Sequence, residues 1–136
     1  MRIHIYVFSG TGNTAWVVDR LAERLQALGD EVVPARCKHV AGTDVDPNAC
    51  DVMGIAFPVH ASYAPSPVRT FITELPPARD TPLFAVTTAG YAAGDTAWYA
   101  VQPLRAKGYK PFVLANVLVA NNLRLPVLSP LPIPTQ

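Results

Sequence analysis

Short apolar runs and amphipathic stretches alternate along this chain. Four runs are almost continuously apolar, as is typical of parallel strands buried on both faces: residues 3–8, 52–57, 83–88 and 112–119. A fifth strand is expected at residues 31–36, and Pro34 within it indicates a position at the edge of a sheet. The segment 37–50 holds few apolar residues and predicts a loop with at most one helical turn.

Helical patterns fill three of the intervals between these strands. The first follows residue 12, where Val18, Leu21, Leu25 and Leu28 recur on one helical face before Gly29 ends the helix. In the second, Ser66 is predicted to cap a helix with Pro67 at its first position, and Pro76 stops it. The third begins at Asp95 or Thr96 and runs to about Lys107, with Pro103 expected to bend it or shorten its hydrogen-bond ladder.

This alternation predicts an α/β fold with a doubly wound parallel sheet of five strands and right-handed crossovers. The last segment departs from it, because prolines at 126, 130, 132 and 134 forbid a closing helix. We therefore expect a domain over residues 1–119, followed at 120–136 by a Pro-rich tail or the start of a linker.

Composition excludes several classes of function. The 136 residues suit one domain with a proper core, and a net charge of +1 without any Lys/Arg cluster argues against nucleic acid as a partner. No apolar stretch approaches the ~20 residues of a membrane span, so we expect a soluble cytoplasmic protein. Two isolated cysteines, Cys37 and Cys50, are too few for an iron–sulfur cluster or a structural zinc, and no metal site is predicted.

The stretch Phe8–Thr14 joins the first strand to the first helix and is the strongest candidate for a binding site. Its glycines and hydroxyls, at the positive end of a helix, are suited to hold a phosphate. A Walker loop is excluded because residues 9–14 contain no lysine. A dinucleotide site remains open on Gly10-x-Gly12-x-x-Ala15, although the second strand closes on Arg36 and permits only a 2′-phosphate cofactor.

A third interpretation uses the hydroxyls of Ser9, Thr11 and Thr14 as donors to phosphate, together with the amides of residues 10–14. This Ser-x-Thr-Gly-x-Thr pattern resembles the phosphate loop of flavodoxins, which bind flavin mononucleotide (FMN). The sequences 57–60 and 87–91, after the third and fourth strands, are similar to that family's two flavin-flanking loops. The resemblance covers residues 1–119 and is nearest to the flavodoxin-like domains of flavodoxin–ferredoxin fusion proteins.

This resemblance implies the strand order 2-1-3-4-5, with the last helix missing or replaced by the Pro-rich tail, and FMN as the cofactor. It also implies three groups of cofactor-binding residues, with Tyr63 and Tyr91 available to stack on the flavin and His60 near its ring. In chain order, the expected site is Ser9, Gly10, Thr11, Gly12, Asn13, Thr14, Pro58, Val59, His60, Ala61, Ser62, Tyr63, Thr88, Ala89, Gly90, Tyr91, Gly94 and Asp95. Trp16 and Trp98 are expected to serve packing instead of the cofactor.

Three functions follow from the resemblance. The first is an electron carrier without catalytic residues, which shuttles electrons between a ferredoxin- or flavodoxin-reductase type of partner and an acceptor. The second is an FMN-dependent NAD(P)H:quinone-type oxidoreductase, which the short loops disfavour. The third is a flavin-free flavodoxin-like interaction domain, which the intact phosphate loop disfavours. An iron–sulfur domain fused to this chain in a longer parent protein would be a further redox partner.

Overall fold

The structure, a computed structural model, describes residues 1–9, 12–37, 40–59, 63–89 and 95–118. Its elements follow one another as strand and helix, with two short 3₁₀ helices (η) after the second strand. Their bounds are β1 Arg2–Val7, α1 Asn13–Ala27, β2 Glu31–Arg36, η1 Gly42–Asp44, η2 Pro47–Ala49, β3 Val52–Pro58, α2 Ser66–Glu74, β4 Thr81–Ala89, α3 Thr96–Ala106 and β5 Tyr109–Leu118. Among them, no helix combines the length and apolarity that a bilayer span requires.

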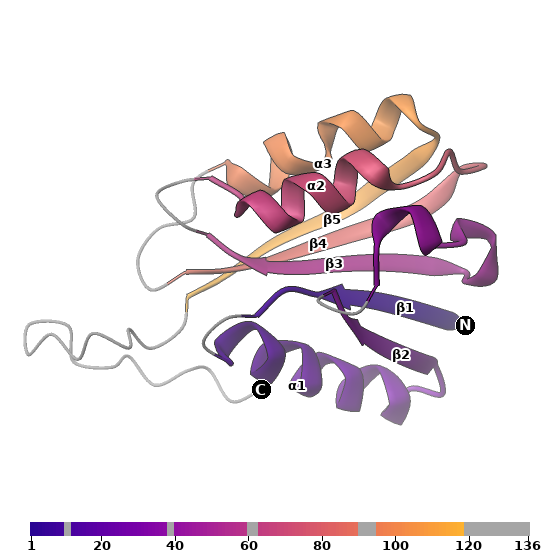
Figure 1. Cartoon of the computed structure of the whole chain (residues 1–136). Coiled ribbons are helices and arrows are strands. Elements are labelled where there is room, and N and C mark those ends of the chain that lie inside the picture. Colours follow the sequence, from indigo (N-terminus) through magenta and orange to yellow (C-terminus); the bar gives the residue numbers. More distant parts are fainter. Residues whose placement is uncertain (10–11, 38–39, 60–62, 90–94, 119–136) are drawn as a thin grey trace, which may run out of the picture.

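The five strands form one sheet in the order β2-β1-β3-β4-β5, and every neighbouring pair is parallel. The predicted fold class and strand order are therefore confirmed. Pro34 lies on β2, which is an edge strand, as its missing N–H requires. Figure 1 shows α1 on one side of the sheet and α2 and α3 on the other.

Several boundaries differ from the sequence predictions. The segment 37–50 holds two 3₁₀ helices instead of at most one turn, because Asp46 caps the second by accepting the N–H of Asn48. Ser66 is the first residue of α2 and makes no cap bond from its side chain. The carbonyl of Pro65 instead accepts the N–H groups of Val68 and Arg69, so the predicted Ser66 cap is wrong.

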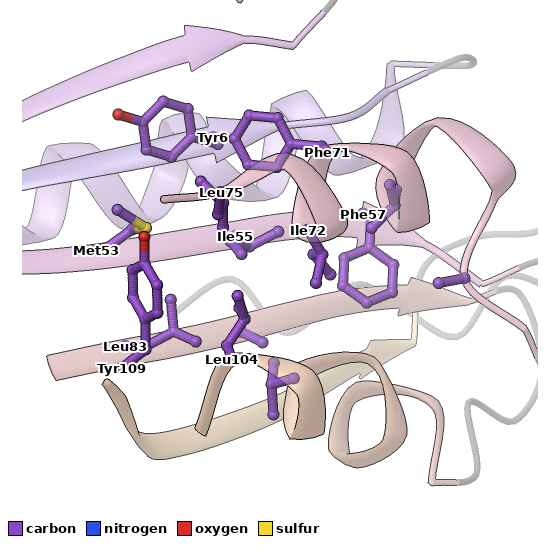
Figure 2. Packing of buried hydrophobic residues seen from close by; sticks show 14 of the residues in the cluster. Tyr6, Met53, Ile55, Phe57, Phe71, Ile72, Leu75, Leu83, Leu104 and Tyr109 are labelled. Carbon is purple, nitrogen blue, oxygen red and sulfur yellow. The ribbon is translucent and has the colours of Figure 1, made fainter. Parts of the chain in front are cut away.

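The face of the sheet that carries α2 and α3, called the α2–α3 face below, holds the larger core. Figure 2 shows its strand side chains meeting those of the two helices. The side chains of Ile55, Phe57, Leu83 and Leu104 are wholly buried. Tyr6, Phe71 and Phe8 extend this core toward the carboxyl ends of the strands, with ring centroids 5.3 Å apart in both contacts of Phe71.

The opposite face, called the α1 face, has a smaller core. Val18 and Ala22 of α1 pack there against Ile5 and Ala56 of the sheet. No side chain fits at Gly54 on this face, because the ring of Phe84 on β4 occupies the place of a Cβ. Trp16 of α1 is 38% exposed and Trp98 of α3 is 47% exposed, so neither side chain belongs to the buried core, and their predicted packing role stays a prediction.

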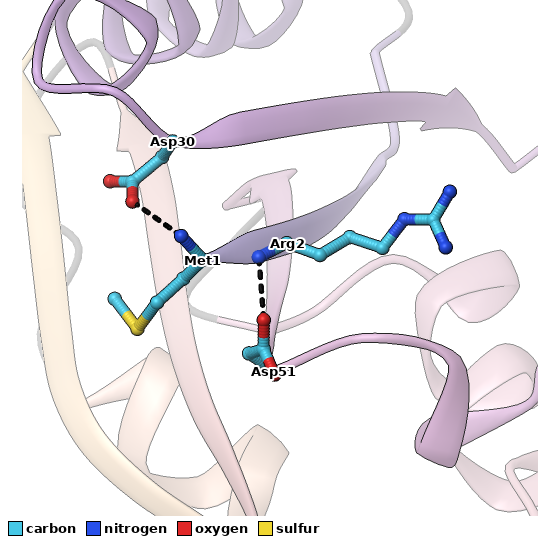
Figure 3. Close-up of polar contacts among 4 residues, drawn as sticks. All are labelled: Met1, Arg2, Asp30 and Asp51. Atoms are coloured by element: carbon cyan, nitrogen blue, oxygen red, sulfur yellow. Dashed lines mark hydrogen bonds and ion pairs between the residues drawn. The ribbon is translucent and has the colours of Figure 1, made fainter.

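Polar contacts fasten the amino ends of the strands. Figure 3 shows the amino group of Met1 paired with Asp30 at 3.0 Å, and the N–H of Arg2 donating to the Asp51 carboxylate at 2.7 Å. These bonds tie the start of β1 to the residues that precede β2 and β3. The opposite edge of the sheet, where the strands end, carries the loops of the predicted site.

Candidate phosphate turn at the carboxyl edge of the sheet

Three strands end together beside the predicted site. The N–H of Phe8 donates to Ala56 on β3 at 2.8 Å, and the N–H of Val59 donates to Thr88 on β4 at 2.9 Å. The chain that leaves β1 is thereby held against β3, and the chain that leaves β3 against β4. Strand order reverses between β1 and β3, which is where open parallel sheets bind their ligands.

In the described part of the turn from β1 into α1, the Ser9 hydroxyl is the centre of two hydrogen bonds. The Ser9 Oγ accepts the N–H groups of Gly12 at 3.1 Å and of Ala15 at 3.4 Å. Gly12 has a φ of 93°, in the left-handed region that glycine adopts without strain, and α1 begins at the next residue. Two N–H groups at a helix N-terminus that share one oxygen are a donor set suited to an anion.

A buried pair of hydroxyls joins this turn to β4. The Oγ1 atoms of Thr14 and Thr88 lie 2.7 Å apart, and either residue could be the donor. Both residues are 2% exposed. The prediction placed Thr14 on the phosphate and Thr88 at the flavin, and the structure brings these two residues into direct contact.

Ten of the predicted site residues lie within the described structure. Seven of them surround the turn and the ends of β3 and β4: Ser9, Gly12, Asn13, Thr14, Pro58, Val59 and Thr88. Ala89 is the last residue of β4, and Asp95 precedes α3, where its carbonyl accepts the N–H of Tyr99. Tyr63 is 72% exposed. Gly10, Thr11, His60, Ala61, Ser62, Gly90, Tyr91 and Gly94 lie outside the described residues.

A cavity of about 910 Å³ opens beside the turn, between the ends of β1 and β2 and the start of α2. Of the predicted residues it includes Ser9 and Pro58. Its walls are mainly apolar, with Phe8 and Phe71 among them, and its charged lining residues are Arg36 and Glu74. Arg36 was predicted only as a partner of a dinucleotide phosphate, and no sequence pattern predicted a cavity at this position.

Cys37 lines this cavity, and its thiol is unreactive. Burial raises the pKa of the Cys37 thiol from 9.0 to about 12, against a smaller opposing effect of its backbone hydrogen bond to Val7. The thiol is therefore protonated at neutral pH and is a poor nucleophile. Burial also raises the pKa of Cys50, so neither cysteine resembles a reactive thiol.

Polar residues at the end of β4 were predicted only in part. Thr87 is fully buried on the α2–α3 face and donates to the Asn116 side chain on β5. The apolar run 83–88, in which Thr87 lies, does not predict this bond. The bond follows from the pairing of Thr87 on β4 with Asn116 on β5. In the described part of the chain, no group of three or more His, Cys, Asp or Glu residues could hold a metal ion.

Comparisons with known proteins identify the fold. No family model matches the sequence, and no curated protein matches it. Solved structures match its fold over most of the chain. The two-electron reduced flavodoxin of Megasphaera elsdenii is 23% identical with a TM-score of 0.76, covering 89% of this chain and 89% of that one.

Two further solved structures have a similar fold. The flavodoxin of Streptococcus pneumonia TIGR4 is 19% identical with a TM-score of 0.71, covering 90% of this chain and 88% of its own. Rubredoxin oxygen:oxidoreductase from Desulfovibrio gigas is 15% identical with a TM-score of 0.67, and the match covers 89% of this chain but 31% of that one. The fold of this chain is thus that of the flavodoxins.

Proposed function

We propose that this protein binds FMN at the turn between β1 and α1 and works as an electron carrier. The observation that carries the proposal is the Ser9-centred turn, placed where the order of a flavodoxin-like sheet reverses. When bound, FMN would supply electron-accepting and electron-donating chemistry that the side chains of this protein lack.

The described residues fit the phosphate of such a cofactor. The N–H groups of Gly12 and Ala15 already converge on a single oxygen, and a phosphate oxygen can take the place of the Ser9 hydroxyl as their acceptor. Arg36 lines the adjoining cavity with Ser9 and adds a positive charge on that side. Glu74 lines the same cavity, so the local backbone donors, and not the net charge of the cavity, favour a phosphate monoester.

The strand order distinguishes FMN from a dinucleotide. Classic dinucleotide-binding sheets have the order 3-2-1-4-5-6, whereas this sheet has the order β2-β1-β3-β4-β5 over the residues that the structure describes. The same order in flavodoxins accompanies FMN at the β1/β3 reversal. We therefore prefer FMN to the 2′-phosphate dinucleotide that Arg36 would permit.

Each loop of the site has a distinct role in this proposal. The turn after β1 holds the phosphate, while the loops that begin at Pro58 and after Ala89 would flank the ring. Val59 and Thr88 keep these two loops at a fixed separation through their backbone bond. Tyr63 is exposed enough to lie against a flat ring, and that contact, like those of His60 and Tyr91, stays a prediction.

The partner is proposed to be a redox protein of the reductase or ferredoxin type, and the compartment the cytoplasm. Some neighbours in fold are named as redox enzymes, such as the rubredoxin oxygen:oxidoreductase described above. In that protein the matching region is a part of a longer chain. A fusion of this chain with an iron–sulfur domain is consistent with such an arrangement and stays a prediction.

The cavity beside the turn supports a second candidate, the NAD(P)H:quinone-type oxidoreductase. Its volume of about 910 Å³ is in the range of small-molecule sites, and its aromatic walls suit a flat acceptor. The two functions differ in how the purified protein behaves. An electron carrier is reduced in two separate one-electron steps, whereas the oxidoreductase consumes NADPH and is reduced in one two-electron step.

The test compares FMN with riboflavin, which lacks the phosphate. Binding is measured as quenching of flavin fluorescence by the protein and by Ser9→Ala and Thr11→Ala variants, with Thr73→Ala on the exposed side of α2 as the control. Each lost hydrogen bond to the charged phosphate is worth about 1.5–3 kcal/mol, so FMN should bind roughly 10- to 150-fold more weakly. Riboflavin affinity should stay within a factor of about three.

Equal losses for the two flavins would place the phosphate elsewhere and overturn the assignment of the turn. If neither flavin is quenched at any concentration, the flavin-free interaction domain becomes the correct description. Steady oxidation of NADPH by the flavin-loaded protein would favour the oxidoreductase over the carrier.

A further inference from the structure

The α1 face of the sheet is covered unevenly. Helix α1 packs mainly on β2, β1 and β3, and Figure 1 shows it beside β1 and β2. On β4 and β5 the side chains of this face form an apolar surface, which we call the open patch. It consists of Phe112, Val113, Ala115 and Val117 on β5, beside the buried ring of Phe84 on β4.

The register of the strands establishes that these residues share one face. Phe84 and Val86 belong to the core under α1, and their partners on β5 are Val113 and Ala115. An irregularity in the pairing before Phe84 leaves Phe112 as an extra residue on β5. Its ring packs edge-on against Phe84, with centroids 6.4 Å apart.

The described residues leave much of this surface open to water. Phe112 is 59% exposed and Val113 is 46% exposed. Parallel sheets are normally buried on both faces, because their strands are apolar on both sides. A patch with an aromatic ring and β-branched side chains therefore indicates that another segment covers it.

We propose that the chain's own residues 119–136 cover the open patch as an extended segment. The described structure ends at Leu118, the last residue of the strand that carries most of the patch. The next 18 residues contain one charged side chain, Arg124, and no Asp or Glu. Their large aliphatic side chains are Val119, Leu123, Leu125, Val127, Leu128, Leu131 and Ile133.

The prolines of this segment select its conformation. On β5 the patch runs from Phe112 to Val117, about 20 Å at the rise of a strand. Prolines at 126, 130, 132 and 134 exclude a continuous helix over the second half of the segment. A polyproline-like chain spans the patch with about 7 residues at 3.1 Å each, so the 18 residues are sufficient.

The prolines also favour the face of β5 over its free edge. A strand added at the edge needs N–H groups in the ladder, and prolines at 126, 130, 132 and 134 have none. Over an apolar face, the same lack of N–H groups is an advantage. Fewer backbone donors are then buried without a partner.

The first experiment measures exposure of the patch by thiol labelling of the full-length protein. Cysteine is placed at the patch (Phe112→Cys) or at the other edge strand (Val33→Cys, where Val33 is 39% exposed) in a Cys37→Ala, Cys50→Ala background. We expect the thiol at 112 to react at least tenfold more slowly than the thiol at 33. Replacing Leu123, Leu125, Leu128 and Leu131 together by serine should bring the two rates within a factor of about two.

The alternatives give different rates. If the thiol at 112 reacts as fast as the thiol at 33 at every protein concentration, nothing covers the patch and the proposal is wrong. Protection that grows with protein concentration and survives the four serine substitutions would assign the patch to a second copy of the chain. That result would also overturn the proposal.

The second experiment is a thermal double-mutant cycle on the full chain. The four serine substitutions should lower the melting temperature by roughly 5 °C, and by less than about 1 °C when Phe112→Thr and Val113→Thr are already present. Val33→Thr, a control at the other edge strand, should leave the effect of the serines unchanged. Equal effects of the serines in both backgrounds would contradict contact between residues 119–136 and the patch.

Discussion

The two faces of this sheet are stabilised in different ways. On the α2–α3 face, side chains from two helices and four strands form a core in which Leu83 and Leu104 are wholly buried. On the α1 face, one helix covers part of the sheet, and the ring of Phe84 fills the place that Gly54 leaves empty. The complete face supplies most of the packing, whereas the partly covered face carries the proposed phosphate turn. Stability and binding can therefore be changed separately.

The largest effect expected on the α2–α3 side is its sensitivity to alkaline pH. Burial raises the pKa values of Tyr6 and Tyr109 from 10.0 to about 12, and burial likewise raises that of Cys37 from 9.0 to about 12. The folded protein holds the protons of these three side chains more tightly than the unfolded chain does. Their contribution to the free energy of unfolding is therefore complete below about pH 9 and is lost as the pH rises to about 12. Each group costs up to ~1.4 kcal/mol per pH unit in that window.

Urea unfolding at several pH values between 8 and 12 measures this loss. Tyr109→Phe should flatten the decline between pH 10 and 12, at the cost of about 1 kcal/mol at pH 8 for the bond from its hydroxyl to Pro76. Tyr99→Phe, which changes a ring that is 67% exposed, is the control. An unchanged alkaline slope in Tyr109→Phe would show that its burial does not control the titration.

Truncation of leucines compares the packing of the two faces directly. Leu104→Ala on α3 removes a wholly buried side chain and should cost about 3–4 kcal/mol of unfolding free energy. Leu21→Ala on α1 removes a side chain at the border of the smaller core and should cost about 1 kcal/mol. Alanine is the best helix former, so neither value includes a helix penalty. Losses of equal size would mean that the α1 face is packed as tightly as the other.

A single ammonium group joins the two helices of the α2–α3 face. The Nζ atom of Lys107 donates to the carbonyl oxygens of Thr73 at 2.6 Å and Leu75 at 2.7 Å, where α2 ends. Lys107→Met keeps the aliphatic stem but leaves these carbonyls without their cation, at a cost of about 1.5 kcal/mol. Lys110→Met, which breaks only an exposed pair with Asp80, should cost less than about 0.5 kcal/mol in the same urea titration. If Lys107→Met loses as little unfolding free energy as Lys110→Met, the contacts of Lys107 with the end of α2 do not stabilise the protein.

The sequence predicted the fold well because its signals were local. Apolar runs such as residues 52–57 and the glycines that end helices follow from strand and helix periodicity alone. The Ser66 cap failed because Pro65 could supply its carbonyl instead, and sequence letters do not decide between two adjacent cap residues. The exposure of Trp98 depends on where α3 lies, which periodicity does not specify.

The site was predictable only as a set of loops. The glycines and hydroxyls of residues 9–14 indicate a phosphate turn, but no pattern places Thr88 against Thr14, which is 74 residues away in the sequence. That contact depends on the pairing of β3 with β4 and on the position of α1 over both strands. The cavity beside Ser9 likewise requires residues from η1 and α2 that no local motif connects.

The smallest expected effect concerns the hydroxyl pair that joins α1 to β4. Thr14→Val keeps the shape of the side chain but leaves the buried Thr88 hydroxyl without this partner, which should cost about 1–1.5 kcal/mol of unfolding free energy. Thr14→Ser keeps the hydroxyl and loses only a methyl group, so it should recover part of this loss. If Thr14→Val is as stable as the unsubstituted protein while Thr14→Ser is not, packing of the methyl group and not the hydrogen bond fixes this end of α1. At the start of α1, the hydrogen bonds to Ser9 and the packing of the Thr14 methyl group would then outweigh the hydroxyl pair.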